Sequence, residues 1–392
     1  MNILHISPYF PALEANHAGG VCMGKQIETL QKQHQVYVLT FVASEFDERL
    51  KAAHKNDFHY QSVKINRWSR LFHVVLEPWM PNYFAARCSL RFAIRLIWMV
   101  KMYHIQAIHG EYASMGQYMW IKRLYPHLQF NMTEHDMTAQ SYERKLRDSS
   151  GWKKYYIRHQ LDRILKKEKK YCTMADCLFT FNQKDRYLIE KKYGRKDCKV
   201  LNPYYGINDD ILEGAVEADR KEYASICFLG QMGRDENYLA AMRLIRIAGI
   251  VKGQIPELTV YIVGNEPPEE LRKQENDYIH VTGFVDDVDE YLKRAKLAVF
   301  PLELGAGIKL KVLRSMAMGT PVITTMVGAE GIDENGEVVE LAETDDEFAE
   351  RITAYLNNPQ MLREREEKSR QYVKDHFGWK ISEKVLEEIY GK

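Results

Sequence analysis

The chain has 392 residues, which is enough for two domains with full hydrophobic cores. Apolar residues make up 45% and charged residues 28%, the profile of a folded globular protein. The formal net charge is only +1, so no global electrostatic field favours nucleic acid as a partner.

The cysteines and the N-terminus indicate a reducing compartment. Six cysteines are scattered along the chain without a C-x-x-C pair, so we expect buried thiols rather than a disulfide framework. The first residues, MNILHISPYF, lack the basic-then-apolar pattern of a signal peptide. No run reaches the about 18 uncharged apolar residues of a spanning helix. We therefore expect a cytoplasmic protein.

Short apolar runs alternate with helical patterns in the first half of the chain. A Pro- and Gly-bearing loop after the first run leads into a helix with Met23, Ile27 and Leu30 on one face. This alternation is typical of parallel β-α-β units with right-handed crossovers. Strands are expected at Asn2–Ser7, Gln35–Val42, Ala107–Glu111, Gln129–His135 and Cys177–Asn182.

The alternation lapses in the polar, acidic stretch 207–224 and begins again at Ser225. We therefore predict an N-terminal domain over 1–206, a linker over 207–224 and a C-terminal domain over 225–375. A last helix over 376–392 is expected to pack back toward the first domain. Helices are also predicted at 237–250 and 307–318. The predicted fold is α/β, with two doubly wound Rossmann-like domains that face an interdomain cleft, since ligands bind beyond the carboxyl ends of such strands.

Two segments of the N-terminal half are candidates for ligand binding. Gly19 and Gly20 lie where a helix is expected to begin, and glycine there lets backbone amides approach a phosphate or a sugar. The alternative is a tight turn without a ligand. His135 lies at the end of a predicted strand, and the flanking Glu134 and Asp136 are expected to orient or charge it. The alternative is a partly exposed histidine with no role.

The most informative segment is 297–332. A strand leads into the glycine loop Gly305-Ala306-Gly307 and then into a helix that bears Lys309 and Lys311. Free amides, the helix dipole and two lysines converge at this point, which predicts a diphosphate site. The alternative, a plain β-α-β unit, does not explain why glycines and lysines coincide there.

The run GAGIKLKVLRSMAMGTPVITTMVGAEGI resembles the signature of family-four retaining glycosyltransferases of the GT-B fold, of the bacterial surface-polysaccharide type. LGQMGRDENYLAAMRLI, YIVGNEP and VTGFVDDVDEYL follow the family's order and spacing. The resemblance is strong over about 225–332 and weaker before it, where HAGGV and TEHDM match in place and kind. It implies an enzyme that needs no metal and takes a UDP- or GDP-linked sugar as co-substrate.

The resemblance also implies which residues form the site. His135, Glu303 and Lys309 are the expected catalytic residues, and Gly19 and Gly20 are expected to reach the donor from the N-terminal side. The other donor-binding residues are expected to be Gly230, Arg234, Gly264, Phe284, Val285, Gly305, Gly307, Ile308, Leu310, Lys311 and Arg314.

The chain departs from the family where many members carry two glutamates eight positions apart. Those positions are Ala306 and Arg314, and an arginine cannot accept a hydrogen bond from the donor ribose. Because relatives tend to carry an arginine at the position of Glu303, we predict an exchanged ion pair between Glu303 and Arg314.

Basic segments of the N-terminal half predict a membrane surface as a partner. Residues 141–171 hold eleven Lys or Arg and four Asp or Glu, with Trp152, Tyr155, Tyr156 and Ile157 interleaved. Upstream, Arg87, Arg91 and Arg95 stand at helical spacing beside Leu90, Ile94 and Ile97, and 67–84 is rich in aromatic residues. Such helices can rest on an anionic bilayer, where a lipid-linked acceptor is presented. The alternative is a solvated helix that packs by one apolar face.

Three functions are consistent with these sequence features. The leading hypothesis is a transferase that passes a sugar to a glycan or lipid-linked acceptor. The second is a catalytically silent GT-B protein that binds a glycan or partners an active transferase. The third is a sugar-phosphate or epimerase-type enzyme on the same fold.

Overall fold

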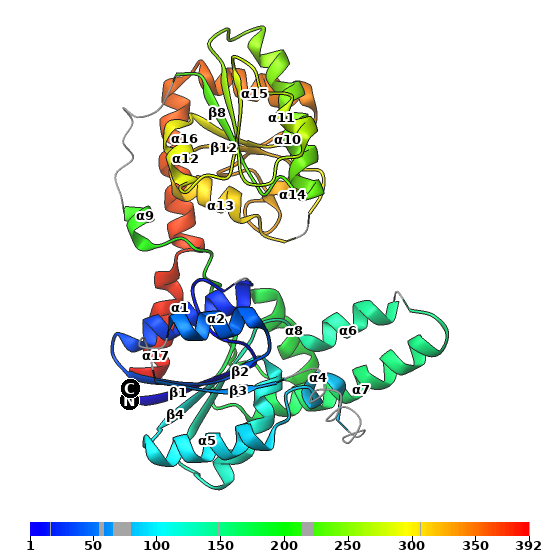
Figure 1. Ribbon diagram of the computed structural model, residues 1–392, viewed down its shortest axis with the longest axis vertical. Helices are drawn as coiled ribbons and strands as arrows, with labels where there is room; N and C mark the ends of the chain where they lie inside the picture. The colour runs from blue at the N-terminus through cyan, green and yellow to red at the C-terminus, as the bar shows by residue number, and fades with distance from the viewer. Residues whose placement is uncertain are drawn as a thin grey trace. The chain divides into compact units, whose positions relative to one another are not determined.

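The computed structural model divides the chain into two compact units, shown in Figure 1. The first unit comprises Met1–Tyr204 together with Trp379–Lys392, and the second comprises Tyr205–Gly378. The residues described are 1–15, 17–54, 59–65, 80–147, 149–213, 223–305 and 307–391. Most of the aromatic stretch 67–84 and part of the expected linker 207–224 therefore lie outside the described residues.

The first unit is built on a parallel sheet of seven strands in the order β3-β2-β1-β4-β5-β6-β7. The strands are β1 Asn2–Ser7, β2 Gln35–Val42, β3 His59–Lys64, β4 Ala107–Glu111, β5 Gln129–Glu134, β6 Leu178–Thr180 and β7 Lys199–Val200. The helices are α1 Ala18–Gln31, α2 Glu45–Ala53, α4 Asn82–Ala85, α5 Leu90–Met102, the 3₁₀ helix η1 Ala113–Arg123, α6 Thr138–Arg147, α7 Gly151–Met174, α8 Gln183–Tyr193 and α17 Trp379–Tyr390.

Alternation along the strands divides the core of this unit between the two faces of its sheet. Ile3 packs on the face that α1 and α17 cover, whereas Leu4 and Ile6 pack on the face that α5 covers. Figure 1 shows α1 and α5 on opposite sides of the sheet. Odd-numbered residues of β4 and β5 therefore point to the face of α1 and α17. Glu111, at the end of β4, and His135, directly after β5, lie on this face.

The second unit has a parallel sheet of six strands in the order β10-β9-β8-β11-β12-β13. The strands are β8 Ser225–Leu229, β9 Thr259–Val263, β10 Ile279–Gly283, β11 Leu297–Phe300, β12 Val322–Thr324 and β13 Glu340–Leu341. The helices are α9 Asp209–Glu213, α10 Asp235–Lys252, α11 Glu269–Arg272, α12 Asp289–Arg294, α13 Leu310–Ala317, α14 Met326–Ala329, α15 Asp345–Leu356 and α16 Pro359–His376.

The prediction of two α/β units with parallel sheets is confirmed. Several helices begin at residues whose side chains accept hydrogen bonds from first-turn amides. Ser44 and Thr344 do so in full capping boxes at α2 and α15. The predicted helix 307–318 is shorter in the structure, because its regular part begins at Leu310. None of the six cysteines forms a disulfide bond. Among the described residues, no helix is long and apolar enough to cross a membrane.

The C-terminal helix α17 is part of the first unit. Its residues Trp379, Leu386 and Tyr390 are buried in one cluster with Ile3 and Phe179. The indole Nε1 of Trp379 donates to Thr29 Oγ1 at 2.7 Å, and the Tyr390 hydroxyl lies 2.7 Å from His109 Nδ1. This helix therefore completes the core around the first sheet.

We predict that Leu386→Ala lowers the free energy of unfolding of the first unit by about 2–5 kcal/mol, because it leaves a cavity beneath α17. Denaturant unfolding followed by circular dichroism measures the change. Lys384→Ala, an exposed position on the same helix, should change stability by less than about 0.5 kcal/mol. Equal effects of the two variants would show that α17 does not contribute to this core.

Candidate functional site

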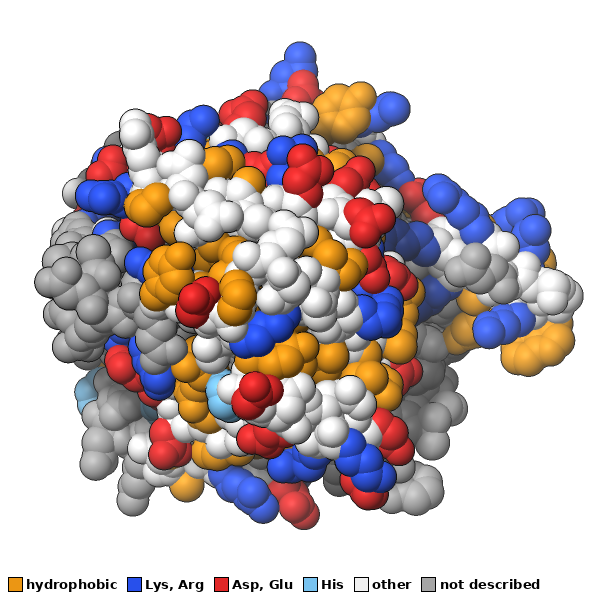
Figure 2. All heavy atoms as spheres, turned by 90° about the horizontal axis from the view of Figure 1, so that it is seen from above, with side chains coloured by type: hydrophobic (Ala, Val, Ile, Leu, Met, Phe, Trp, Pro, Cys, Tyr) orange, Lys and Arg blue, Asp and Glu red, His pale blue; other side chains and the backbone are white. Residues whose placement is uncertain are grey.

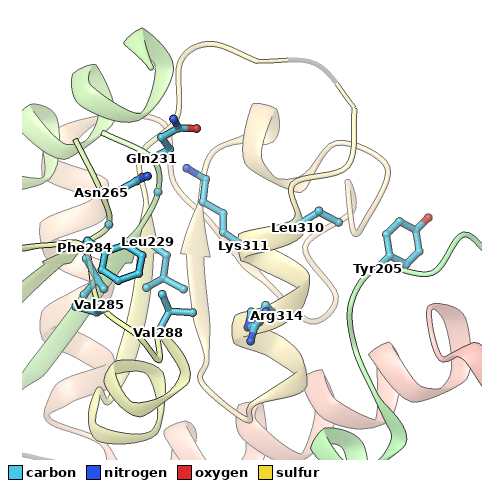
Figure 3. Close-up of a pocket in the computed structure, with 13 residues that line it drawn as sticks. Tyr205, Leu229, Gln231, Asn265, Phe284, Val285, Val288, Leu310, Lys311 and Arg314 are labelled. Carbon is cyan, nitrogen blue, oxygen red and sulfur yellow. The ribbon is translucent and has the colours of Figure 1, made fainter. Parts of the chain in front are cut away.

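A cavity of about 380 Å³ opens at the carboxyl edge of the second sheet. It lies where β8, β9 and β10 end and where α13 begins. Figure 3 shows Leu229, Phe284, Val285 and Val288 grouped on the strand side, with Lys311 and Arg314 on α13. The lining residues are Tyr205, Leu229, Gly230, Gln231, Val263, Gly264, Asn265, Phe284, Val285, Val288, Leu310, Lys311 and Arg314. The cavity thus has an apolar wall and a cationic wall.

The floor of this cavity is formed by two backbones in close contact. Gly264 has a φ of +147°, and a Cβ atom there would lie 1.7 Å from the carbonyl oxygen of Gly230. The Gly230 amide donates to Val263 O at 3.0 Å, which holds the ends of β8 and β9 together. Only glycine fits at position 264, so both predicted glycines shape the cavity floor.

Lys311 carries a partly buried amine and lines both this cavity and an adjoining one. Its Nζ donates to Asn237 Oδ1 and lies 4.7 Å from the ring centroid of Phe228. Burial, together with the positive charges of Arg234 and Lys309 and against the opposing charge of Glu236, lowers the pKa of Lys311 to about 7. An anion in the cavity would favour the charged form and raise this pKa again.

A second cavity of about 380 Å³ adjoins the first and shares Gly230, Gln231, Leu310 and Lys311 with it. Three predicted cations, Arg234, Lys309 and Lys311, line this second cavity, as do Gly305 and Ile308. Arg234 forms an ion pair with Glu236, with 2.6 Å between Nη2 and Oε1. The two cavities together bring most of the predicted donor-binding residues to one place.

The opening of α13 is partly occupied by a carboxylate of the protein. Gly307 N donates to Glu330 Oε2 at 2.9 Å, and Lys309 Nζ lies 3.5 Å from the same oxygen. Lys309 Nζ also donates to Gly307 O at 2.6 Å. The amides of Leu310 and Lys311 lie in the first helical turn, where they have no intrahelical acceptor. These amides remain for a ligand, whereas the predicted Gly307 amide already has a partner.

The predicted ion pair between Glu303 and Arg314 is wrong. Arg314 binds Asp289 at the start of α12, with Nε–Oδ1 at 2.5 Å and Nη2–Oδ2 at 3.0 Å. The Glu303 side chain is 65% exposed, and its Oε1 lies 3.4 Å from Arg243 Nη1. Glu303 stands in the loop after β11, and its side chain lies near Arg243 on α10 rather than near Arg314 on α13. Arg314 lines the first cavity, and Glu303 lines neither cavity.

In the first unit, a buried carboxylate holds His135. Glu111 Oε2 lies 2.6 Å from His135 Nε2, and Glu111 Oε1 lies 2.9 Å from His5 Nε2 and 3.3 Å from His109 Nε2. Burial alone would raise the pKa of Glu111, but hydrogen bonds from the three histidines hold it well below its usual range. With Nε2 bound to Glu111, Nδ1 is the nitrogen of His135 that is left for a ligand.

Glu134 and Asp136 do not orient His135, contrary to the prediction. Successive strand residues point to opposite faces of a sheet, so Glu134 lies on the face of α7, beside Glu168. Asp136 is exposed. The sequence signal for the true partner is the run QAIHGE, in which Glu111 ends the neighbouring strand β4.

Gly19 and Gly20 lie at the start of α1, next to His135. A Cβ atom at Gly19 would lie 2.0 Å from the Tyr112 hydroxyl and 3.4 Å from His135 Nδ1. The Tyr112 ring stacks on His135 with 3.8 Å between centroids. The Gly20 amide is bound by the N-cap side chain of His17, at 3.0 Å. Gly19 therefore gives access to His135, whereas the Gly20 amide has a structural partner.

The structure also brings together three residues with metal-ligating side chains that the sequence did not indicate. Atoms of His5, His109 and Glu111 lie within 4.8 Å of one another, and all three residues are buried. Thr133 Oγ1 lies 2.7 Å from His109 Nε2, so hydrogen bonds already use these atoms. The three residues form a closed polar network that fixes Glu111.

We predict that Glu134→Gln removes a pH-dependent instability. Burial and the Glu168 carboxylate raise the pKa of Glu134 well above 4.5, so the folded protein holds a proton that the unfolded chain releases. Stability is therefore full below the unfolded pKa and is lost as the pH rises through the raised value. Calorimetric unfolding of the wild type from pH 4.5 to 8 should show a decline that is smaller in the variant.

The control for this prediction is Glu190→Gln, at an exposed position of α8. It should keep the wild-type dependence of unfolding temperature on pH. The same decline in Glu134→Gln as in the wild type would contradict the assignment of that proton.

Residues 224–358 match the family model described as Glycosyl transferases group 1. The matched residues include β8, β9, β10 and α13, which line the cavities of the second unit. A comparison with curated proteins finds no match. The match lies wholly within the second unit.

Several solved structures are similar over the whole chain. The Anabaena protein HepE, in complex with UDP, has 13% identity and a TM-score of 0.62, with 100% of both chains covered. A glycosyltransferase from Rickettsia africae has 14% identity and a TM-score of 0.62, with 99% of this chain and 97% of that chain covered. Sucrose-phosphate synthase from Thermosynechococcus elongatus has 17% identity and a TM-score of 0.56, with 100% and 98% covered. The fold is therefore GT-B.

Proposed function

We propose that the chain is a retaining glycosyltransferase that moves a sugar from a nucleotide-diphosphate sugar to a glycan or lipid-linked acceptor. The observation that carries this proposal is the double cavity of the second unit, which has an apolar wall on the strands and is also lined by the cations Lys309, Lys311 and Arg234. An apolar wall suits a nucleobase, and cations beside a helix N-terminus suit a diphosphate. The family match supports the same function.

In this proposal Phe284 and Val285 pack against the base, and Gly230 and Gly264 let it approach the backbone. The amides of Leu310 and Lys311 and the ammonium groups of Lys309 and Lys311 hold the diphosphate. Uridine is the favoured base, because the HepE structures contain UDP or UDP-glucose. The Glu330 carboxylate, which binds the Gly307 amide, would meet the donor diphosphate as a competing anion.

In the proposed reaction the acceptor oxygen bonds to the anomeric carbon on the face from which the diphosphate leaves. The bond from that carbon to the diphosphate oxygen breaks, and the hydroxyl proton passes to the departing diphosphate. The sugar therefore retains its configuration. Lys309 and Lys311, rather than a metal ion, neutralise the charge that develops on the leaving group.

His135 is the proposed catalytic residue of the first unit. Glu111 holds its Nε2, which leaves Nδ1 to contact a sugar hydroxyl. Glu111 is then a positioning residue. The resemblance implies that Glu303 is catalytic. In this proposal Glu303 has a smaller role, because its side chain pairs with Arg243 and lines neither cavity.

A catalytically silent protein of the same fold is the second candidate. The observation that favours it is Arg314, which stands where the resemblance implies a ribose-binding glutamate and is bound to Asp289. Slow release of UDP from UDP-sugars, or GDP from GDP-sugars, separates the two candidates. Turnover without acceptor supports the transferase, and binding without turnover supports the silent protein.

We predict that Lys311→Met weakens UDP binding about 10- to 100-fold, because a charge-assisted hydrogen bond to the diphosphate is lost. Lys311 is half deprotonated near pH 7 in the free protein, and binding an anion restores its proton. Wild-type affinity should therefore fall as the pH rises above 7, by up to about tenfold per pH unit. Isothermal titration calorimetry at pH 6.5, 7.5 and 8.5 measures both effects.

The matched control is Lys273→Met, at an exposed position where the lysine pairs with Glu269. It should leave UDP affinity and its pH dependence unchanged. A Lys311→Met protein that binds UDP as tightly as the wild type would exclude the proposed diphosphate site.

The proposal places the protein at the inner face of a bacterial plasma membrane, in the synthesis of surface polysaccharide. Helix α5 supports a membrane surface as a partner. Leu90, Ile94, Trp98 and Met102 recur every four residues and are 74%, 58%, 43% and 55% exposed. Arg91 and Lys101 flank this apolar stripe, and the helix has no acidic residue. Two details of the sequence prediction change, because Ile97 packs on the core and Arg87 is buried.

The hairpin of α6 and α7 offers a second basic surface. Trp152 and Tyr155, in the first two turns of α7, are 81% and 78% exposed and lie among lysines and arginines. In Figure 2 the lobe that projects on the right, the side on which Figure 1 shows this hairpin, carries basic and hydrophobic side chains together. Such surfaces bind anionic headgroups through charge and through aromatic insertion.

We predict that the double variant Leu90→Asp, Ile94→Asp reduces co-sedimentation with phosphatidylglycerol vesicles at least tenfold, because two apolar anchors become charged. Vesicles of phosphatidylcholine alone should bind the wild type poorly. The control is Leu239→Asp, Ile250→Asp on α10, where both residues are also exposed. Binding that ignores either the anionic lipid or the α5 substitutions would contradict the membrane proposal.

A further inference from the structure

The first unit has a cavity of its own, of about 320 Å³, near the carboxyl ends of β1, β4 and β5. Its walls are rich in tyrosine, since Tyr9, Tyr83, Tyr112 and Tyr142 all line it. Two basic side chains, Arg87 and Lys145, line it as well. None of the roles assigned above uses this cavity.

Arg87 is a buried cation without a carboxylate partner among the described residues. Arg87 is only 8% exposed, and its Nε has no hydrogen-bond partner in the part of the chain that the structure describes. Within that part, its Nη1 donates to Ala86 O at 3.3 Å, and its guanidinium lies 5.1 Å from the ring centroid of Tyr9. Burying a guanidinium without an anion costs free energy, so an anionic group that binds in this cavity would stabilise Arg87.

Lys145 stands on another wall, in the last turn of α6. Its Nζ lies 4.8 Å from the ring centroid of Tyr142 and takes part in no ion pair among the described residues. The cavity lining includes one carboxylate, Asp136, which is exposed. Two cations against one exposed carboxylate leave the cavity positive.

Tyr112 connects this cavity to His135. Its ring lines the cavity and stacks on His135 with an interplanar angle of 11°. A ligand held by Arg87 therefore lies one aromatic ring away from the proposed catalytic histidine. This is the position of a substrate rather than of a remote regulator.

We propose that this cavity binds the acceptor of the transfer reaction through a phosphate or diphosphate group, which Arg87 and Lys145 hold by charge-assisted hydrogen bonds. The tyrosine rings pack against the apolar or sugar part next to that group. A neutral glycan acceptor would give the buried guanidinium no partner, and the phosphorylated acceptor does. The inference rests on the proposed transferase function and adds the chemical class of its acceptor.

The test is acetylation of lysines in the full chain with an amine-reactive acetyl ester, followed by mass spectrometry. The protein is first saturated with UDP, and inorganic pyrophosphate or farnesyl diphosphate is then titrated. Lys145 should be acetylated at least fivefold more slowly when either compound is bound. Lys191 is the matched control, because it also lies over a tyrosine ring, that of Tyr187, but lines none of the cavities described here. Its acetylation rate should not change.

The two compounds distinguish the sources of the phosphate. Protection of Lys145 by farnesyl diphosphate at a tenfold lower concentration than by pyrophosphate assigns a lipid-linked acceptor. Equal concentrations assign a soluble phosphorylated acceptor. No protection by either compound, or equal protection of Lys191, overturns the inference.

Lys311 reports on the proposed function in the same experiment. UDP should slow its acetylation, because bound UDP covers the amine and favours its protonated form, whereas about half of the amine is deprotonated and reactive near pH 7 without ligand. Protection of Lys145 without protection of Lys311 by UDP refutes the proposed donor site and leaves the anion site standing. The reverse result refutes the anion site alone.

Substitutions locate the effect at Arg87. Arg87→Gln should raise the diphosphate concentration for half-protection of Lys145 at least tenfold, and Arg87→Lys should raise it less, because the charge remains. Ser141→Glu places a negative charge at an exposed position of the cavity wall and should have the effect of Arg87→Gln without disturbing the core. Wild-type protection in both Arg87→Gln and Ser141→Glu would overturn the inference.

Discussion

Every candidate site in this protein depends on the geometry of parallel strands, which gathers the carboxyl ends of distant segments at one edge of a sheet. In the second unit, the ends of β8, β9 and β10 and the start of α13 form the proposed donor cavity. In the first unit, the ends of β4 and β5 place Glu111 beside His135 although 24 positions separate them. The strands fix the positions of the site residues, and the loops that follow them carry side chains and amides that can bind a ligand.

Buried charge has two different roles in this protein. In the first, the Glu111 carboxylate is surrounded by His5, His109 and His135, so its charge is satisfied within the protein. In the second, burial makes the Lys311 ammonium unstable, and in the first unit's cavity Arg87 has no carboxylate partner among the described residues. The first arrangement fixes a geometry, and the other two favour an incoming anion.

The sequence predicted the fold, and most of the residues it named at the strand–helix junctions of the second unit line two adjoining cavities, because glycines and lysines there are constrained by backbone geometry. It could not predict side-chain partners that depend on direction. Glu303 and Arg314 lie eleven positions apart on either side of a glycine loop, and each forms an ion pair with a residue of a different helix. Adjacency in the sequence favours Glu134 as a partner of His135, but Glu134 ends β5 with its side chain on the opposite face of the sheet, beside Glu168. The helical spacing of Arg87, Arg91 and Arg95 predicts a basic surface stripe, but tertiary packing buries Arg87.

The path of the chain has a consequence for biosynthesis. The backbone leaves the first unit after Tyr204 and rejoins it at Trp379, so the second unit is an insertion in the first. During vectorial translation the inserted unit is complete before α17 leaves the ribosome, and until then Ile3, Phe179 and His109 lack the helix that covers them. The N-terminal half must therefore wait, partly uncovered, while the C-terminal half folds. Helix α17, which follows the inserted unit in the chain, therefore closes a core whose strands precede that unit.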